Sequence, residues 1–282
     1  MTTNNLTKHL QTALMLTAMG LLSMACNESP MEQQSDSTQA DEVQEVKTSI
    51  KTGTRLSYTA TKVMVSNNMD NGAKNQTTND ALYKEVQQVD VFVDQKGKRC
   101  EEFSRMLDHS HKKPGYDPTL ATERITRNGQ TSAFNAAGKL LYTTNLPNDG
   151  AKGGTEPDYS ELLMTCAQRS EGLRLLIEQA QHLGHGISVE QPSENVAKLI
   201  VRNDDGATNI TYLNLKYGVP VKSEAYDAQG VLTSSLLQLY KLVDDIPVLA
   251  YEETIGYSTN LDGERIEHKQ IMHYDNIKLE KF

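Results

Sequence analysis

The chain has no tryptophan and only four phenylalanines in 282 residues. It also lacks an apolar run of the about 20 residues that a membrane-spanning helix needs. Lysine and arginine number 28 against 37 acids, so the formal charge is −9 and no basic run is present. An acidic chain of this kind is a poor candidate for nucleic-acid binding, which depends on phosphate contacts. The composition also excludes collagen, a coiled coil and a multi-span membrane protein.

The sequence has none of the common catalytic or metal-binding motifs. Gly-x-Ser-x-Gly, His-Glu-x-x-His and Cys-x-x-Cys are all absent. Residues 151–155 (Ala-Lys-Gly-Gly-Thr) lack the Gly-Lys-Ser/Thr ending of a phosphate loop. The aspartate pairs at 204–205 and 244–245 flank turns, where aspartate is favoured by local hydrogen bonds. We therefore expect no enzyme, no metal site and no cofactor.

The histidines also fit structural roles better than catalytic ones. His109 and His111 adjoin a cationic loop, and His182 and His185 lie at the expected end of a helix. A zinc site needs three or four ligands in fixed geometry, and neither pair supplies them. His268 is expected to be a hydrogen-bonded wall residue of the sheet.

The N-terminus has the pattern of a secretory signal. Residues 1–25 carry one formal charge, Lys8, followed by the apolar stretch 10–25. The segment ends Met24-Ala25-Cys26, which resembles the bacterial lipoprotein box, with Ser23 where leucine is usual. The resemblance implies that residues 1–25 are removed and that Cys26 is acylated, for example with palmitate. The alternative is a cut nearby that leaves Cys26 a plain thiol.

The segment that follows Cys26 is acidic and has no aromatic side chain. Residues 27–46 contain six acids and no lysine or arginine. Such a composition cannot bury enough apolar surface to offset chain entropy, so we expect 26–46 to be a lipidated cysteine and a disordered tether. The other two cysteines, Cys100 and Cys166, either form a disulfide or remain two unpaired thiols; the sequence leaves both open.

Residues 47–282 are expected to form one mainly β (α+β) domain with a curved antiparallel sheet. Alternating polar and apolar residues, separated by Gly-containing turns, are typical of such a meander. The expected strands are 56–65, 86–94, 99–106, 124–126, 131–135, 139–143, 197–202, 208–216, 221–226, 231–243, 248–257 and 265–274. Apolar residues at helical spacing within 157–184 predict two short helices with a break near 170–172, after a loop at 148–154.

Two stretches resemble a known family. Arg124-Ile-Thr-Arg-Asn-Gly-Gln-Thr-Ser-Ala-Phe-Asn and Val219-Pro-Val-Lys-Ser-Glu-Ala-Tyr-Asp-Ala-Gln-Gly-Val-Leu-Thr are similar to strand–turn–strand units of the LolA/LolB-like lipoprotein carriers. The order strand–helix–strand over residues 47–282 is similar as well. The resemblance implies an unclosed β-barrel, with helices over one opening and an apolar cavity for acyl chains. No binding residue of the family can be placed on this chain.

The expected strand 231–243 has apolar residues on both faces. A strand with one face in water should carry polar residues at alternate positions, so we expect both faces to be covered. One face would then line a lipid cavity; the alternative is a central strand in a packed core. If neighbouring strands are in simple register, one inward set is expected from three strands: Leu237, Leu239, Leu249, Tyr251, Ile255, Tyr257, Ile266, Met272 and Tyr274.

Together these features predict an envelope lipoprotein, anchored by Cys26 in the outer membrane, that binds or carries lipid or lipoprotein acyl chains. The alternative is a structural or interaction lipoprotein whose barrel is filled by its own side chains. An enzyme is the least favoured class. The ligand, the protein partner and the membrane face do not follow from the sequence.

Overall fold

The computed structural model describes residues 48–68, 83–111, 121–127, 130–145, 159–183, 186–259, 261 and 263–282. All of them belong to one compact unit, Thr48–Phe282. The expected signal peptide (1–25), Cys26, the acidic tether and the 148–154 loop lie outside the described residues. Within the described part, no helix is both long and apolar enough to cross a membrane.

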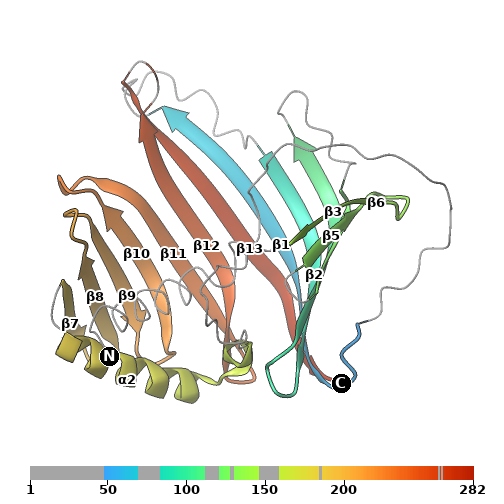
Figure 1. Ribbon diagram of the computed structural model, residues 1–282, viewed down its shortest axis with the longest axis horizontal. Helices are drawn as coiled ribbons and strands as arrows, with labels where there is room; N and C mark the ends of the chain where they lie inside the picture. The colour runs from blue at the N-terminus through green and yellow to red at the C-terminus, as the bar shows by residue number, and fades with distance from the viewer. Residues whose placement is uncertain are drawn as a thin grey trace. The chain divides into compact units, whose positions relative to one another are not determined.

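Thirteen strands form a single antiparallel sheet (Figure 1). Six strands precede the helical segment: β1 (Gly53–Asn68), β2 (Tyr83–Asp94), β3 (Cys100–His111), β4 (Glu123–Arg127), β5 (Gln130–Phe134) and β6 (Leu140–Asn145). Seven follow it: β7 (Ile187–Ser193), β8 (Val196–Arg202), β9 (Thr208–Asn214), β10 (Val219–Tyr226), β11 (Leu232–Val243), β12 (Ile246–Thr259) and β13 (Arg265–Lys281).

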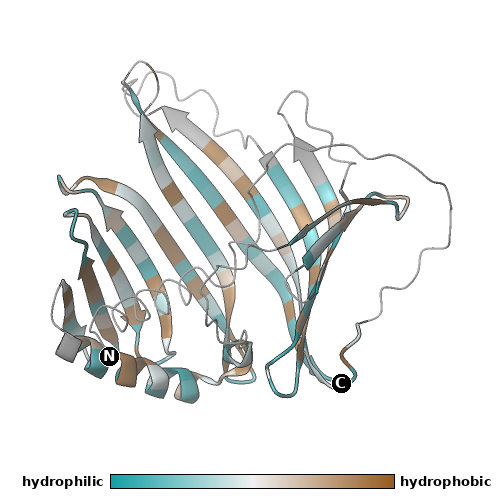
Figure 2. Cartoon of the chain, in the orientation of Figure 1, coloured by the Kyte–Doolittle hydropathy of each residue, from teal (hydrophilic) through white to brown (hydrophobic). Residues whose placement is uncertain are grey.

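The order of the strands is that of a meander joined at the middle. It runs β6-β5-β4-β3-β2-β1-β13-β12-β11-β10-β9-β8-β7, so strands pair with their neighbours in sequence within β1–β6 and within β7–β13, and β1 also pairs with β13. The edge strands β6 and β7 do not pair with each other, and the sheet is curved and unclosed. Apolar and polar residues alternate along the strands, as Figure 2 shows. The predicted fold class is confirmed.

A short 3-10 helix, η1 (Ser160–Leu163), and one α-helix, α2 (Cys166–Leu183), link the two halves. The expected break near 170–172 is wrong: the interruption lies at Met164–Thr165, and α2 continues through Gly172. The side chain of Thr165 accepts a hydrogen bond from the backbone of Gln168, and the Gln168 side chain accepts one from the Thr165 backbone. This capping box starts the helix at Cys166. A glycine in an exposed helix costs only about 1 kcal/mol, so Gly172 does not end it.

Hydrogen bonds fix both ends of the helical segment to the sheet. The Tyr159 backbone N–H donates to Gly97 O, in the β2–β3 turn, at 2.7 Å. The Cys166 N–H donates to Asp245 O, in the β11–β12 turn, at 2.8 Å. Strands lie about 4.8 Å apart, so these turns are separated by four strand spacings, about 19 Å. Residues 159–166 therefore cross one end of the sheet.

Further along, α2 lies against the turn between β9 and β10. Ser170 Oγ donates to Lys216 O at 2.9 Å. Gly218, at φ +64°, comes so close to the helix that an added Cβ would lie 2.3 Å from the carbonyl carbon of Arg169. The turn and the helix can approach only because residue 218 has no side chain.

One strand of the structure was not expected from the sequence, and several others, among them β1, β3, β12 and β13, are longer than expected. β7 was not expected, because Pro192 interrupts a weak alternation; proline is tolerated in β7 because it is an edge strand. β12 begins at Ile246 and includes Pro247, whereas residues 244–247 were expected to be a separator. β13 continues to Lys281 past an irregularity near Asn276, which has φ +54°.

Candidate functional site

Strand register divides the described side chains between two faces of the sheet. We call inner the face that η1 and α2 cover at one end. Arg169 of α2 is within electrostatic reach of Tyr240 on β11, and Tyr159 is within reach of Cys100 on β3. Directly paired residues share a face, so the register extends the inner face from these two residues across the seven strands from β10 to β3.

The expected inward set is divided between the two faces. Tyr251 pairs with His273, Ile255 with Lys269, and Tyr257 with Glu267. These three tyrosine and isoleucine side chains therefore lie on the face opposite to Ile266, Met272 and Tyr274. The expectation that the two strands point their apolar sets the same way is wrong, because the β12–β13 pairing is offset by one residue from the register that we assumed.

The remaining members of the set also separate. Leu237 pairs with Glu253 and Leu239 with Tyr251, so both lie on the outer face. They are 38% and 53% exposed, so the outer face of β11 is not covered. The prediction that both faces of this strand are covered is therefore wrong. Leu249 is buried on the inner face, because an irregularity at Ala250 reverses the alternation within β12.

The inner face also carries half-buried apolar side chains, which lie among polar ones. Its half-buried apolar residues come from β1, β3, β11 and β13: Leu56, Met106, Leu232, Leu236, Ile266 and Met272. Leu236 is the inner-face neighbour of the outer-face Leu237. These adjacent residues of β11 therefore lie on opposite faces of the sheet.

The centre of the inner face carries a group of polar side chains, of which only Tyr274 belongs to the inward set expected from the sequence. We call Tyr58, Glu102, Gln238, Glu252 and Tyr274 the inner polar cluster. The Tyr58 and Tyr274 rings meet edge to face, with centroids 5.5 Å apart. Gln238 Nε2 donates to Glu252 Oε2 at 3.0 Å, and Tyr240 OH donates to Gln238 Oε1 at 3.3 Å.

Burial dominates the electrostatics of this cluster. It raises the pKa of Tyr274, with Glu252 and Tyr58 adding to the effect, and it raises the pKa of Tyr58. It also raises the pKa of Glu252, against the hydrogen bond from Gln238, and that of Glu102, against the charge of Arg124. The inner face is thus an environment of low polarity in which charged carboxylates are costly.

The two glutamates of this cluster could have been expected from the sequence. Glu101-Glu102 and Glu252-Glu253 are adjacent acids inside strands, so alternation must place one member of each pair on each face. Glu102 and Glu252 are the inner members. Nothing in the pattern could have shown that Tyr58 and Tyr274 lie beside them, because this depends on the pairing of the first and last strands.

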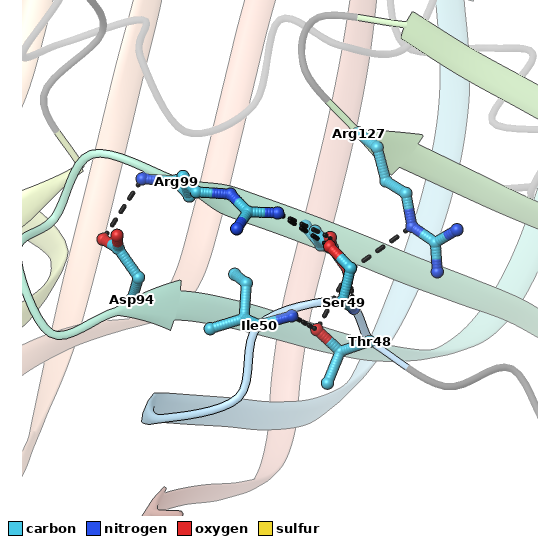
Figure 3. Close-up of polar contacts among 7 residues, drawn as sticks. Thr48, Ser49, Ile50, Asp94, Arg99 and Arg127 are labelled. Carbon is cyan, nitrogen blue, oxygen red and sulfur yellow. Dashed lines mark hydrogen bonds and ion pairs between the residues drawn. The ribbon is translucent and has the colours of Figure 1, made fainter.

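The outer face carries ion pairs and a buried anchor for the start of the domain. Glu101, 3% exposed, accepts bonds from Thr48 Oγ1 at 2.9 Å, from the Ser49 N–H at 3.0 Å, and from Ser49 Oγ. Arg127 lies 3.4 Å from it, and Arg99 Nη2 donates to Ser49 Oγ at 2.7 Å (Figure 3). Burial alone would raise the pKa of Glu101, but the bonds from Ser49 and Thr48 and the charge of Arg127 hold it below its ordinary value.

The two remaining cysteines are free thiols in the structure. Cys100 is the first residue of β3, on the inner face, where burial and the charges of Glu102 and Glu101 raise the pKa of its thiol to about 12. Cys166 is buried at the start of α2, and burial, followed by Asp245, raises the pKa of its thiol.

The other residues weighed from the sequence have local structural roles. Asp244 and Asp245 form the β11–β12 turn with φ of 50° and 63°. His268 Nε2 and Ser258 Oγ are hydrogen-bonded at 2.7 Å on the wall of the sheet. Residues 151–155 and 185, and the side chains of His109, His111 and His182, lie outside what the structure describes. Among the residues that it does describe, no three His, Cys, Asp or Glu side chains gather to hold a metal.

Neither a family model nor a curated protein matches the sequence. Solved structures do resemble the fold. A domain named as an outer membrane lipoprotein-sorting protein, from Vibrio parahaemolyticus, aligns with TM-score 0.40 and 12% identity over 81% of this chain and 86% of that one.

Two other solved structures are similar. A DUF1329 family protein from Desulfovibrio piger has TM-score 0.39 and 8% identity over 81% and 86% of the two chains. A LolA superfamily protein from Nitrosomonas europaea has TM-score 0.35 and 9% identity over 80% and 87%. These similarities concern the fold alone.

Proposed function

We propose that the domain binds lipid, or the acyl chains of a lipoprotein, against the inner face of its sheet. The observation that carries the proposal is a set of half-buried apolar side chains on that face, contributed by β1, β3, β11 and β13. Apolar side chains that remain partly accessible on a curved, half-covered face can bury a flexible hydrocarbon chain. We further propose that the protein is an envelope lipoprotein anchored at Cys26 in the outer membrane.

The affinity is expected to depend on how much of the acyl chain is buried. Each methylene removed from water contributes about 0.8 kcal/mol, and a tenfold change in affinity corresponds to about 1.4 kcal/mol. Two additional methylenes should therefore strengthen binding about tenfold until the inner surface is filled. A ligand held mainly by its polar end would show no such dependence on chain length.

Leu236 and Leu237 provide a matched test, because adjacent leucines of β11 lie on opposite faces. We expect Leu236→Glu to weaken binding of a fluorescent fatty acid at least about tenfold, since it places a carboxylate where the chain would lie. Leu237→Glu, on the exposed outer face, should bind within about twofold of the parent. Thermal melting of both variants would show that each still folds.

Two results would contradict the proposal. One is a parent protein that binds no acyl chain of any length. The other is equal loss of binding in the two variants while both keep their folds. Either result would favour the alternative of a structural or interaction lipoprotein, to which the burial of the inner polar cluster also points.

A further inference from the structure

Tyr274 has an unusual position on the inner face. Its side chain is 5% exposed, and its hydroxyl has no hydrogen-bond partner among the described residues. Phenylalanine would fill the same space without a buried polar atom. A buried hydroxyl of this kind therefore requires an explanation, and a partner brought by a ligand is one.

The surroundings of this hydroxyl are acidic. The carboxyl groups of Glu85, Glu102 and Glu252 lie on the inner face nearby. Two cations offset part of their charge: Arg124 is 4.0 Å from Glu85, and Lys62 pairs with Glu85 in register. Among the described residues, the only hydrogen-bond partner of Glu252, which is 6% exposed, is the amide of Gln238. Glu252 also acts electrostatically on Tyr274 more strongly than any other charged group.

We propose that the inner polar cluster binds a primary ammonium group at the polar end of the bound amphiphile. The ammonium would pair with the Glu252 carboxylate and donate a hydrogen bond to the Tyr274 hydroxyl oxygen. A carboxylate or phosphate in the same place would be repelled by Glu252 and Glu102. This assignment rests on the proposed function, because the acyl chain would lie on the adjoining apolar surface.

The test compares three single-chain probes of equal length by isothermal titration calorimetry: dodecylammonium, dodecanol and dodecanoate. The full-length protein should bind dodecylammonium at least about tenfold more tightly than either of the others. Butylammonium, which has the charge without the long chain, should bind at least about 100-fold more weakly than dodecylammonium. Equal binding of the two amines would overturn the assignment to an amphiphile.

Two variants remove the proposed contacts, and two others are their controls. Tyr274→Phe and Glu252→Gln should each lower the preference for dodecylammonium over dodecanoate at least about fivefold, with dodecanol binding kept. Tyr251→Phe and Glu253→Gln make the same chemical changes at positions on the outer face of β12, where Tyr251 OH donates to Glu253 at 2.7 Å. Both controls should keep the preference of the parent.

Folding is measured on each variant. Tyr274→Phe should melt no lower than the parent, since it removes an unpartnered hydroxyl and keeps the ring that packs on Tyr58. The ammonium assignment would be overturned if the parent bound the three probes equally well, or if its preference persisted in both Tyr274→Phe and Glu252→Gln. Either result would leave the proposed binding of acyl chains unaffected. A parent that binds none of the probes would overturn the proposed function as well.

Discussion

At the scale of single residues, two pairs of adjacent glutamates report the difference between the faces. The outer members, Glu101 and Glu253, have cationic partners in Arg127 and Lys269, and their pKa values are lowered in spite of burial. Burial raises the pKa values of the inner members, Glu102 and Glu252. Neighbours in sequence thus shift in opposite directions, because alternation places them in different environments.

Glu101→Gln should therefore lower stability mainly at neutral pH. The folded-state pKa of Glu101 is lowered, so its contribution is present above the unfolded pKa of about 4.3 and is lost as pH falls through the folded pKa. We expect a cost of about 2 kcal/mol at pH 7, from weakened charge-assisted hydrogen bonds, and a smaller difference from the parent near pH 3. Urea unfolding between pH 3 and 8 measures this.

Glu252→Gln is the opposite control. The folded-state pKa of Glu252 is raised, so the parent loses stability as pH rises from about 4.3 through that folded pKa, and the variant does not. Relative to the parent, Glu252→Gln should gain stability with rising pH while Glu101→Gln loses it. Parallel pH profiles for the two variants would contradict the assignment of the faces.

At the scale of elements, alternation identified most strands but could not determine how they pair. The strand 231–243 and its two faces follow from the sequence, as do the turns around Asp244 and Gly230. A one-residue offset between β12 and β13 leaves every local pattern unchanged and still moves Ile266 and Met272 to the opposite face from Ile255. Thr165 and Gln168 form a capping box, a sequence pattern that indicates the start of the helix. Gly172 was wrongly expected to break the helix.

The contact between α2 and the β9–β10 turn gives a prediction at this scale. Gly218 and Gly230 both have positive φ, +64° and +78°, but only Gly218 has a neighbour where a Cβ would be. Gly230→Ala should cost only the backbone strain, about 1 kcal/mol. Gly218→Ala should cost at least about 2 kcal/mol more, because α2 has to move away from the turn. Denaturant unfolding of both variants gives the comparison.

Helical circular dichroism at 222 nm would show whether the Gly218→Ala variant retains α2. Equal costs for the two substitutions would mean that α2 does not depend on the close approach of the turn. In that case the positive φ of residue 218 would be the remaining reason for a glycine there.

At the scale of the whole molecule, the two ends of the domain are joined. Gly53 and Phe282 exchange backbone hydrogen bonds of 3.0 and 3.1 Å, and the Phe282 ring meets Phe92 edge to face. The chain enters through residues 48–50, which Glu101 holds on the outer face.

Cys26 is the residue on which the proposed anchoring depends. Twenty-one residues separate it from Thr48, and as a flexible coil they would span about 25 Å on average. Cys26→Ser should leave the signal segment uncleaved and remove the acyl mass, because only the thiol can be acylated at that position. Cys100→Ser and Cys166→Ser are the controls, since both residues lie inside the folded domain, and membrane partition should not change in either. Intact mass spectrometry of the membrane fraction, with labelled palmitate as tracer, distinguishes the three variants. Acylated, membrane-bound Cys26→Ser protein would refute the anchor, and loss of anchoring in a control variant would show that the fold contributes to it.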